Sequence, residues 1–224
     1  MIAAAPQAAP RPPSVGESLR QAGRDFYAES WRLVLLNSLF SACVLLVLVL
    51  ALYVPPAIVL LVATGPLLAW LVAAAVIVVD EGSLTFVETA EALRRVWRRG
   101  LVLGAFVVGA VLVSVFAFGF YAGSGAVAWP LAVLVLYLGG LFALHQVLLW
   151  PLAVRSERPL GELARAAALA LVRRPGATTG FGVAVLAVNL AGLALGLLPF
   201  LMLTIAYTAL AAARFTRGVG EWPA

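Results

Sequence analysis

Charged residues are scarce in this chain, and their scarcity excludes a water-soluble globular domain. Only 11% of the 224 residues are charged and 64% are hydrophobic, with a mean hydropathy of +1.07. A soluble domain carries about 25% charged residues, because polar side chains have to cover its surface. The composition therefore predicts an integral membrane protein.

Cysteine and histidine are almost absent, and lysine is missing. The single cysteine, Cys43, excludes a disulfide within the chain, and the single histidine, His145, leaves too few ligands for a zinc site. The sequence also contains no phosphate-binding loop and no dinucleotide fingerprint. It therefore predicts no cofactor, no metal site and no enzyme activity.

Long apolar runs are what the chain does contain. A helix of about 20 mostly apolar residues crosses the roughly 30 Å hydrocarbon core of a bilayer, and backbone groups in lipid must be bonded within the segment. Short turns join the runs in pairs, which predicts an all-α integral membrane protein with three transmembrane hairpins. The six predicted spans are about 33–54, 57–79, 101–122, 127–150, 177–196 and 199–214.

All the ionic side chains fall on one predicted side of the membrane. The three short turns, near 54–56, 123–126 and 196–199, contain none of the fifteen basic and ten acidic residues. Cytoplasmic segments of membrane proteins are enriched in arginine and lysine. The sequence therefore predicts a multi-pass protein of the cell inner (cytoplasmic) membrane with both termini in the cytoplasm.

The segments that precede the three hairpins have matching patterns. One helical stripe has the same offsets in each segment, and a capping box is predicted from Thr85 and Glu88. We therefore expect a cytoplasmic amphipathic helix before each hairpin. The stripe residues are Val15, Leu19, Ala22 and Phe26, then Phe86, Ala90, Leu93 and Trp97, then Leu160, Ala164, Ala167 and Leu171.

The even spacing of these stripes predicts three copies of one unit. The copies are expected at about 14–80, 85–154 and 159–217, within a single transmembrane domain of residues 14–217. The alanine- and proline-rich residues 1–13 are expected to be a disordered tail, and residues 218–224 a second tail.

Arginines gather where two predicted spans leave the cytoplasm. Their apolar neighbours Leu93, Val96 and Trp97 suit a bilayer surface, and no base-reading groups accompany them, so we expect no nucleic-acid binding. The arginines are expected to anchor the chain among anionic lipid headgroups, at about 1 kcal/mol each, or to dock a membrane-protein partner. The anchoring or docking candidates are Arg94, Arg95, Trp97, Arg98, Arg99, Arg173 and Arg174.

Polar positions inside the predicted spans are the default functional candidates of a membrane protein. Asn37 and Asn189 are amides that bond across helices or face a cavity, Pro66 is expected to kink its span, and His145 and Gln146 lie near the inner end of the fourth span. A Ser124–His145 nucleophile pair is excluded, because roughly 30 Å of helix separates the two residues.

Small residues four positions apart allow helices to approach closely in lipid. Such pairs predict close helix packing, although any glycine-rich membrane chain contains some of them. The pairs are Gly100–Gly104, Ala105–Gly109, Gly176–Gly180 and Gly192–Gly196.

Several of these motifs resemble the YesL-like family of small bacterial membrane proteins, over roughly residues 17–217. The resembling features are Asn37, "TGP" at 64–66, "TFVETAEALRRVWRRG" before the third span and "LARAAALALVRRPGATT" at 163–179. The chain departs from the family in the second cytoplasmic helix. Family members tend to carry basic residues spaced by phenylalanines there, whereas this chain has Ala90, Leu93 and Trp97 in the stripe. The resemblance implies an accessory role beside a carbohydrate importer and brings no catalytic residues.

Two hypotheses follow for the function. The first is a non-enzymatic accessory or scaffold subunit of a larger membrane complex. The second is a stand-alone transporter or binder of a small solute, with its site near Asn37, Pro66 and Asn189, which predicts a polar cavity between the first, second and fifth spans.

Overall fold

The computed structural model describes residues 14–197 and 200–217, which contain eight α-helices and no strand. The predicted tails, 1–13 and 218–224, lie outside the described residues, as does the part of the last predicted turn at 198–199. The elements are α1 Val15–Ala28, α2 Ser30–Tyr53, the 3-10 helix η1 Pro55–Thr64, α3 Gly65–Glu81, α4 Phe86–Gly123, the short 3-10 helix η2 Ala126–Ala128, α5 Trp129–Arg155, α6 Leu160–Arg173, α7 Pro175–Ala194, the π-helical segment η3 Phe200–Thr204 and α9 Ile205–Phe215.

Five helical segments of the described chain are long and apolar enough to cross a membrane. They confirm the predicted all-α, multi-pass class. The sixth predicted span corresponds to Phe200–Phe215, an apolar helix that is shorter than the other five. The five segments are Ser30–Tyr53, Pro55–Glu81, Phe86–Gly123, Ala126–Arg155 and Pro175–Ala194.

Helix α3 is the centre of the packed core. Every residue from Leu71 to Val79 is buried, because α3 is apolar on all its faces and packs against α2, α4, α5 and α9. Helix α9 lies between α1 and α3, and its side chains from Ala209 to Ala213 are buried as well. The last predicted span is therefore enclosed by protein along most of this stretch.

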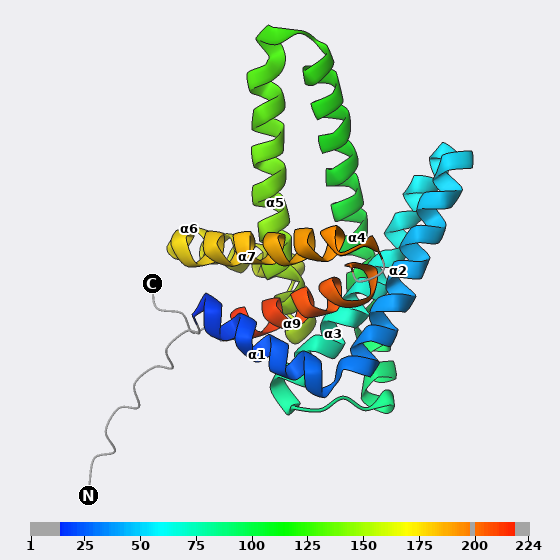
Figure 1. Ribbon diagram of the computed structural model, residues 1–224, viewed down its shortest axis with the longest axis vertical. Coiled ribbons are helices and arrows are strands. Elements are labelled where there is room, and N and C mark those ends of the chain that lie inside the picture. Colours follow the sequence, from blue (N-terminus) through cyan, green and yellow to red (C-terminus); the bar gives the residue numbers. More distant parts are fainter. Residues whose placement is uncertain (1–13, 198–199, 218–224) are drawn as a thin grey trace, which may run out of the picture.

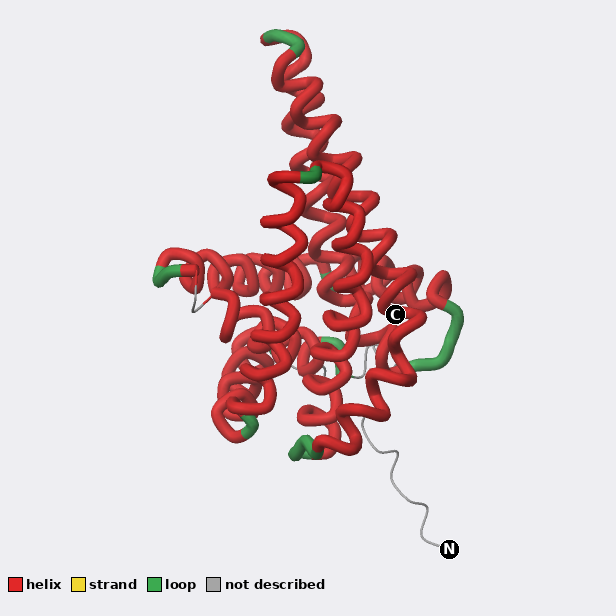
Figure 2. Tube along the Cα trace, turned by 90° about the vertical axis from the view of Figure 1, so that its right-hand side faces the viewer, coloured by secondary structure: helices red, strands yellow, loops and turns green. Residues whose placement is uncertain are grey.

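Two helical pairs extend from this core in the same direction. Figure 1 shows α4 and α5 as a long hairpin and α2 with η1 as a second, tilted arm, and Figure 2 shows both from the side. Only 11% of the most apolar stretch of α4 and 6% of that of α5 is buried. Exposed apolar surface of this extent is unfavourable in water, so these arms are suited to lipid.

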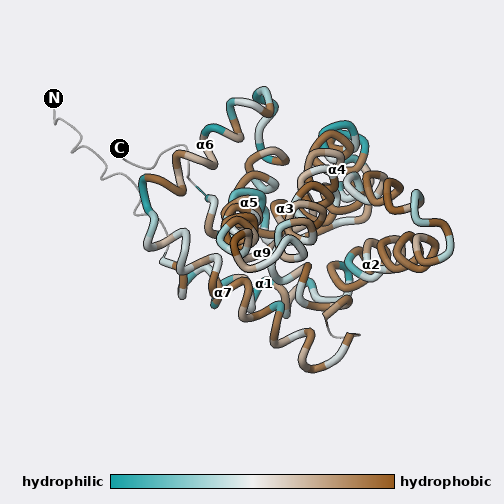
Figure 3. Tube along the Cα trace, turned by 90° about the horizontal axis from the view of Figure 1, so that it is seen from above, coloured by the Kyte–Doolittle hydropathy of each residue, from teal (hydrophilic) through white to brown (hydrophobic). Residues whose placement is uncertain are grey.

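Helices α6 and α7 lie across the α4–α5 hairpin. In the view from above, α4 and α5 are seen nearly end-on, whereas α6 and α7 run in the plane of the picture (Figure 3). The first helix of the third predicted hairpin, α7, is therefore not parallel to the helices of the α4–α5 hairpin.

The cytoplasmic helix predicted before the third span is not a separate element. The 38 residues of α4 run without interruption from the predicted cytoplasmic helix into the predicted span. Its predicted start is confirmed, because the Thr85 side chain accepts a hydrogen bond from the Glu88 backbone and the Glu88 carboxylate accepts one from the Thr85 backbone. No proline interrupts α4, so the helix continues. The other two predicted helices, α1 and α6, are separate: α1 ends before Glu29 and α6 before Arg174.

The predicted stripe on the first turns of α4 is not its buried face. Phe86 and Trp97 are 62% and 45% exposed, whereas Thr89, Ala92 and Val96 are buried. The inward face carries small side chains because α3 approaches α4 closely there. The large apolar side chains point outward instead.

A cluster of three glycines permits that approach. A Cβ atom on Gly65 would lie 2.3 Å from the Gly100 carbonyl oxygen and 2.8 Å from the Gly104 Cα. The predicted packing role of Gly100 and Gly104 is therefore confirmed, and their partner is the "TGP" segment. Of the other predicted pairs, Gly192 contacts Thr204, but Gly109, Gly176 and Gly180 face open space.

Candidate functional site

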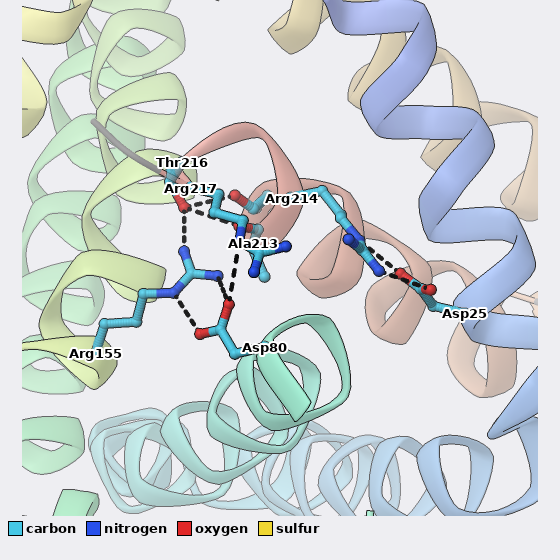
Figure 4. Close-up of polar contacts among 8 residues, drawn as sticks. Asp25, Asp80, Arg155, Ala213, Arg214, Thr216 and Arg217 are labelled. Carbon is cyan, nitrogen blue, oxygen red and sulfur yellow. Dashed lines mark hydrogen bonds and ion pairs between the residues drawn. The ribbon is translucent and has the colours of Figure 1, made fainter. Parts of the chain in front are cut away.

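Arginine and aspartate side chains tie four helices together at the charged end of the molecule. Asp80, at the end of α3, accepts hydrogen bonds from Arg155 of α5 at 3.1 Å (Nε) and 3.2 Å (Nη2). Arg155 also donates to the Thr216 hydroxyl at 3.2 Å, and Arg217 Nε lies 3.7 Å from Asp80 Oδ1 (Figure 4). This network connects the ends of α3, α5 and α9.

A second ion pair joins the first and last described helices. Asp25 of α1 accepts two hydrogen bonds from Arg214 of α9, at 2.7 and 2.9 Å (Figure 4). Neither residue was a sequence candidate, and no local pattern could have paired residues that lie 189 positions apart.

Arg99, one of the predicted anchors, caps the end of α5. Its guanidinium donates to the backbone oxygens of Ala153 at 2.9 Å, of Arg158 at 3.2 Å and of Ser156. The last carbonyls of a helix have no partner within the helix and carry partial negative charge, so a guanidinium stabilises them. Arg99 is thus held in place by protein contacts.

The remaining predicted anchors occupy two separate elements. Arg94, Arg95 and Arg98 are exposed on α4, and the Arg98 guanidinium lies 5.4 Å from the centre of the Trp97 ring. Arg173 is exposed at the end of α6, and Arg174 is half-buried where α7 begins. The exposed arginines are accessible to lipid headgroups.

A polar pocket of about 310 Å³ lies between α4 and the end of α5. Three arginines and one glutamate line the pocket, together with alanine, serine and valine residues. The lining residues are Arg95, Val96, Arg99, Ala153, Val154, Arg155, Ser156 and Glu157.

Asn37 is fully buried on α2, and neither its amide nitrogen nor its amide oxygen has a hydrogen-bond partner among the described residues. One turn further along the same face, the Ser41 hydroxyl donates to the Leu201 carbonyl at 2.8 Å. Leu201 belongs to the π-helical segment η3, and such segments are frequent at functional sites. The Asn37 side chain therefore lacks hydrogen-bond partners in the described part of the chain and lies one turn from a contact with the irregular backbone of η3.

The other two members of the predicted solute site lie at different helix contacts. Asn189 of α7 donates to the Val185 carbonyl at 2.8 Å and to the Thr208 hydroxyl of α9 at 3.0 Å. Pro66 packs against α4, where its Cα lies 2.7 Å from the position that a Cβ on Gly100 would take. The structure thus uses Asn189 and Pro66 in packing between helices.

His145 and Gln146 face different neighbours on α5. The His145 Nε2 atom lies 3.0 Å from the Ala164 carbonyl of α6, so that nitrogen carries the proton and donates. Gln146 is buried, and its amide oxygen has no partner within the described chain. Gln146 lines an apolar groove of about 420 Å³ between α3, α4, α5 and α9. A second apolar groove, of about 600 Å³, lies between α5 and α7 beside Asn189.

Within residues 14–197 and 200–217, no three His, Cys, Asp or Glu side chains gather in an arrangement that could hold a metal ion. The Ser124 hydroxyl donates to the Phe120 carbonyl of its own helix at 2.6 Å.

The fold defines an α-helical, multi-pass membrane protein in which several polar side chains join one helix to another. No protein family, no curated protein and no solved structure matches the chain.

Proposed function

We propose that the protein is a non-enzymatic accessory or scaffold subunit of a larger complex in the inner membrane. The observation that carries this proposal is the α4–α5 hairpin, which extends from the core with apolar side chains exposed on its sides, such as Val113, Phe116 and Tyr137. The two apolar grooves along α5 offer a partner helix a place to pack.

Purification in mild detergent from the native host, with mass spectrometry of the co-purified proteins, tests this function. Gly139 lines the first groove and has open space around its Cβ position, so Gly139→Phe is expected to fill the groove and remove the partner. Gly119→Phe is the matched control, because Gly119 also faces open space but lines neither groove. A protein that always purifies alone, or that loses its partner equally in both variants, would refute the accessory role.

The resemblance to the YesL-like family supports a carbohydrate importer as the complex. The same co-purification tests this point, because the partners should then include permease or ATPase subunits of such an importer. Partners of any other kind would leave the scaffold role in place and reject the importer.

A stand-alone solute binder is the second candidate, and the unpartnered amide of Asn37 favours it. Binding would raise the unfolding temperature of the purified protein in the presence of the solute, and Asn37→Leu would abolish that rise. A panel of small sugars and amino acids that leaves the unfolding temperature unchanged would argue against this candidate.

For the topology, we propose six crossings with both termini in the cytoplasm. The 39 residues from Pro175 to Ala213 contain no charged side chain, and the exposed side chains of α7 include Val183, Leu186 and Leu190. The crosswise orientation of α7 favours a second arrangement, in which two hairpins cross and the third lies at the membrane surface. Both arrangements have an even number of crossings.

Accessibility of a single cysteine distinguishes the two arrangements. In a Cys43→Ser background, Val127→Cys marks the outer turn and Glu157→Cys the cytoplasmic side, since Val127 is 95% exposed and Glu157 is also exposed. Leu195, at the end of α7, is 79% exposed. Leu195→Cys should react with a membrane-impermeant maleimide from outside if the chain crosses six times. Reaction only after the cells are opened would establish the surface arrangement.

A further inference from the structure

The arginine-lined pocket between α4 and α5 lies at the boundary between the charged and the apolar parts of both helices. Arg99 is the last charged residue of α4, and residues 100–123 carry no charge. Arg155 is the last residue of α5, and residues 129–154 carry none either. If the hairpin crosses the bilayer, as proposed above, the pocket is at the depth of the lipid headgroups.

The charges around the pocket are of both signs. Arg155 is neutralised by Asp80, and Arg99 is fixed by the carbonyl oxygen of Ala153 in α5 and by those of Ser156 and Arg158 just after it. Arg95 and Glu157 line the pocket and are exposed, and neither forms an ion pair or a hydrogen bond with another described residue. The pocket thus presents two guanidinium groups beside one unused carboxylate.

Guanidinium groups bind phosphate with two parallel hydrogen bonds, and a fixed guanidinium loses little entropy on binding. A carboxylate beside a bound phosphate would repel a purely anionic headgroup but would attract an ammonium group. A headgroup that carries both a phosphate and a primary ammonium matches both features.

We propose that this pocket binds the headgroup of phosphatidylethanolamine, with the phosphate on Arg95 and Arg99 and the ammonium on Glu157. The acyl chains then extend along the exposed apolar sides of α4 and α5, whose first members above the pocket include Leu101 and Val102. The site rests on the proposed crossing of α4 and α5 but needs no protein partner. Its failure would therefore be distinct from failure of the accessory role.

Native mass spectrometry of the full-length protein in detergent, with matched phosphatidylethanolamine, phosphatidylglycerol and phosphatidylcholine, tests the site. Phosphatidylethanolamine should bind most tightly, because phosphatidylcholine cannot donate a hydrogen bond to Glu157 and phosphatidylglycerol has no ammonium. Arg95→Gln should weaken its binding by roughly tenfold, the loss expected for one charge-assisted pair. Arg94→Gln removes the same charge from the same helix outside the pocket and should change binding by less than about twofold. Arg99 is unsuitable for substitution, because it also holds the end of α5.

Glu157→Gln supplies the second readout. It should reduce the preference for phosphatidylethanolamine over phosphatidylglycerol by roughly tenfold, without changing the unfolding temperature. Equal losses in Arg94→Gln and Arg95→Gln would show diffuse attraction and overturn the site. Equal binding of phosphatidylcholine and phosphatidylethanolamine would overturn the role of Glu157, and displacement of the lipid by inorganic phosphate would show that the pocket holds a soluble anion instead.

Discussion

The carboxylate of Asp25 receives both the Nε–H and an Nη2–H of Arg214, at 2.7 and 2.9 Å, and so joins the N-terminal helix α1 to α9. The Tyr207 hydroxyl donates to the Leu19 carbonyl at 2.9 Å and joins the same two helices. Buried Ala22 of α1 packs between these two contacts. Helix α1 is therefore fixed to the core by directional bonds as well as by its apolar face.

Asp25→Asn should lower the free energy of unfolding by about 1–3 kcal/mol. The two side chains are only 17% and 18% exposed, so the loss falls between that of a surface pair and that of a buried one. Unfolding by sodium dodecyl sulfate, followed by tryptophan fluorescence, measures the change. Arg24→Gln is the control, because it removes an exposed neighbouring charge and should cost less than about 0.5 kcal/mol. A double-mutant cycle with Arg214→Gln that gives no coupling energy would show that the pair contributes nothing.

Asp80→Asn should cost less than Asp25→Asn, about 0.5–1 kcal/mol. The Asp80 carboxylate is 36% exposed, and its closest approach to Arg217 is 3.7 Å, so solvent weakens both of its ion pairs. Raising the salt concentration should reduce the effect of Asp80→Asn more than that of Asp25→Asn. The reverse order of the two losses would contradict the assignment of Asp25–Arg214 as the stronger contact.

Buried Asn37 and half-buried Asn189 should respond to the same substitution with opposite signs. Asn37→Leu should raise the free energy of unfolding by about 1–3 kcal/mol, because it replaces an amide that has no partner among the described residues by an apolar side chain of similar size. Asn189→Leu should lower it by about 1–2 kcal/mol, because the bond to Thr208 is lost. Destabilisation by Asn37→Leu in the purified protein would show instead that a bound molecule satisfies this amide.

The sequence predicted the class of the fold because its main signal, the length of apolar runs, is local. The Thr85–Glu88 capping box is also local and was placed correctly. The contacts that join the helices are not local. Asp25 binds Arg214, and Ser41 binds the Leu201 carbonyl, and these partners are 189 and 160 positions apart in the sequence. Nothing in the residues around either partner indicates such a contact.

The apolar stripe at the start of α4 was expected to face either lipid or the base of the bundle, and the residues that pack against α3, such as Ala92, are not part of it. Sequence patterns identify a helix's buried face by its large apolar residues, such as Phe86 and Trp97. In a membrane protein, lipid is as apolar as the core, and the inward face is instead selected by small size, as in Ala92 and Gly100. The continuity of α4 has a different cause: no proline separates its amphipathic first turns from its apolar part.

Close packing at the α3–α4 crossing makes Gly65 one of the most sensitive positions of the chain. In Gly65→Ala, the new Cβ would lie 2.3 Å from the Gly100 oxygen, which is backbone and cannot rotate away, so the two helices must separate. We expect a loss of about 1–3 kcal/mol, the usual cost of overpacking. Gly109→Ala, on α4 but with open space around its Cβ position, should instead be neutral or stabilising by up to about 1 kcal/mol, because alanine favours the helix. Equal effects of the two substitutions on unfolding in detergent would mean that α3 and α4 do not approach through these glycines. The close packing of α3 against α4 described above would then be incorrect.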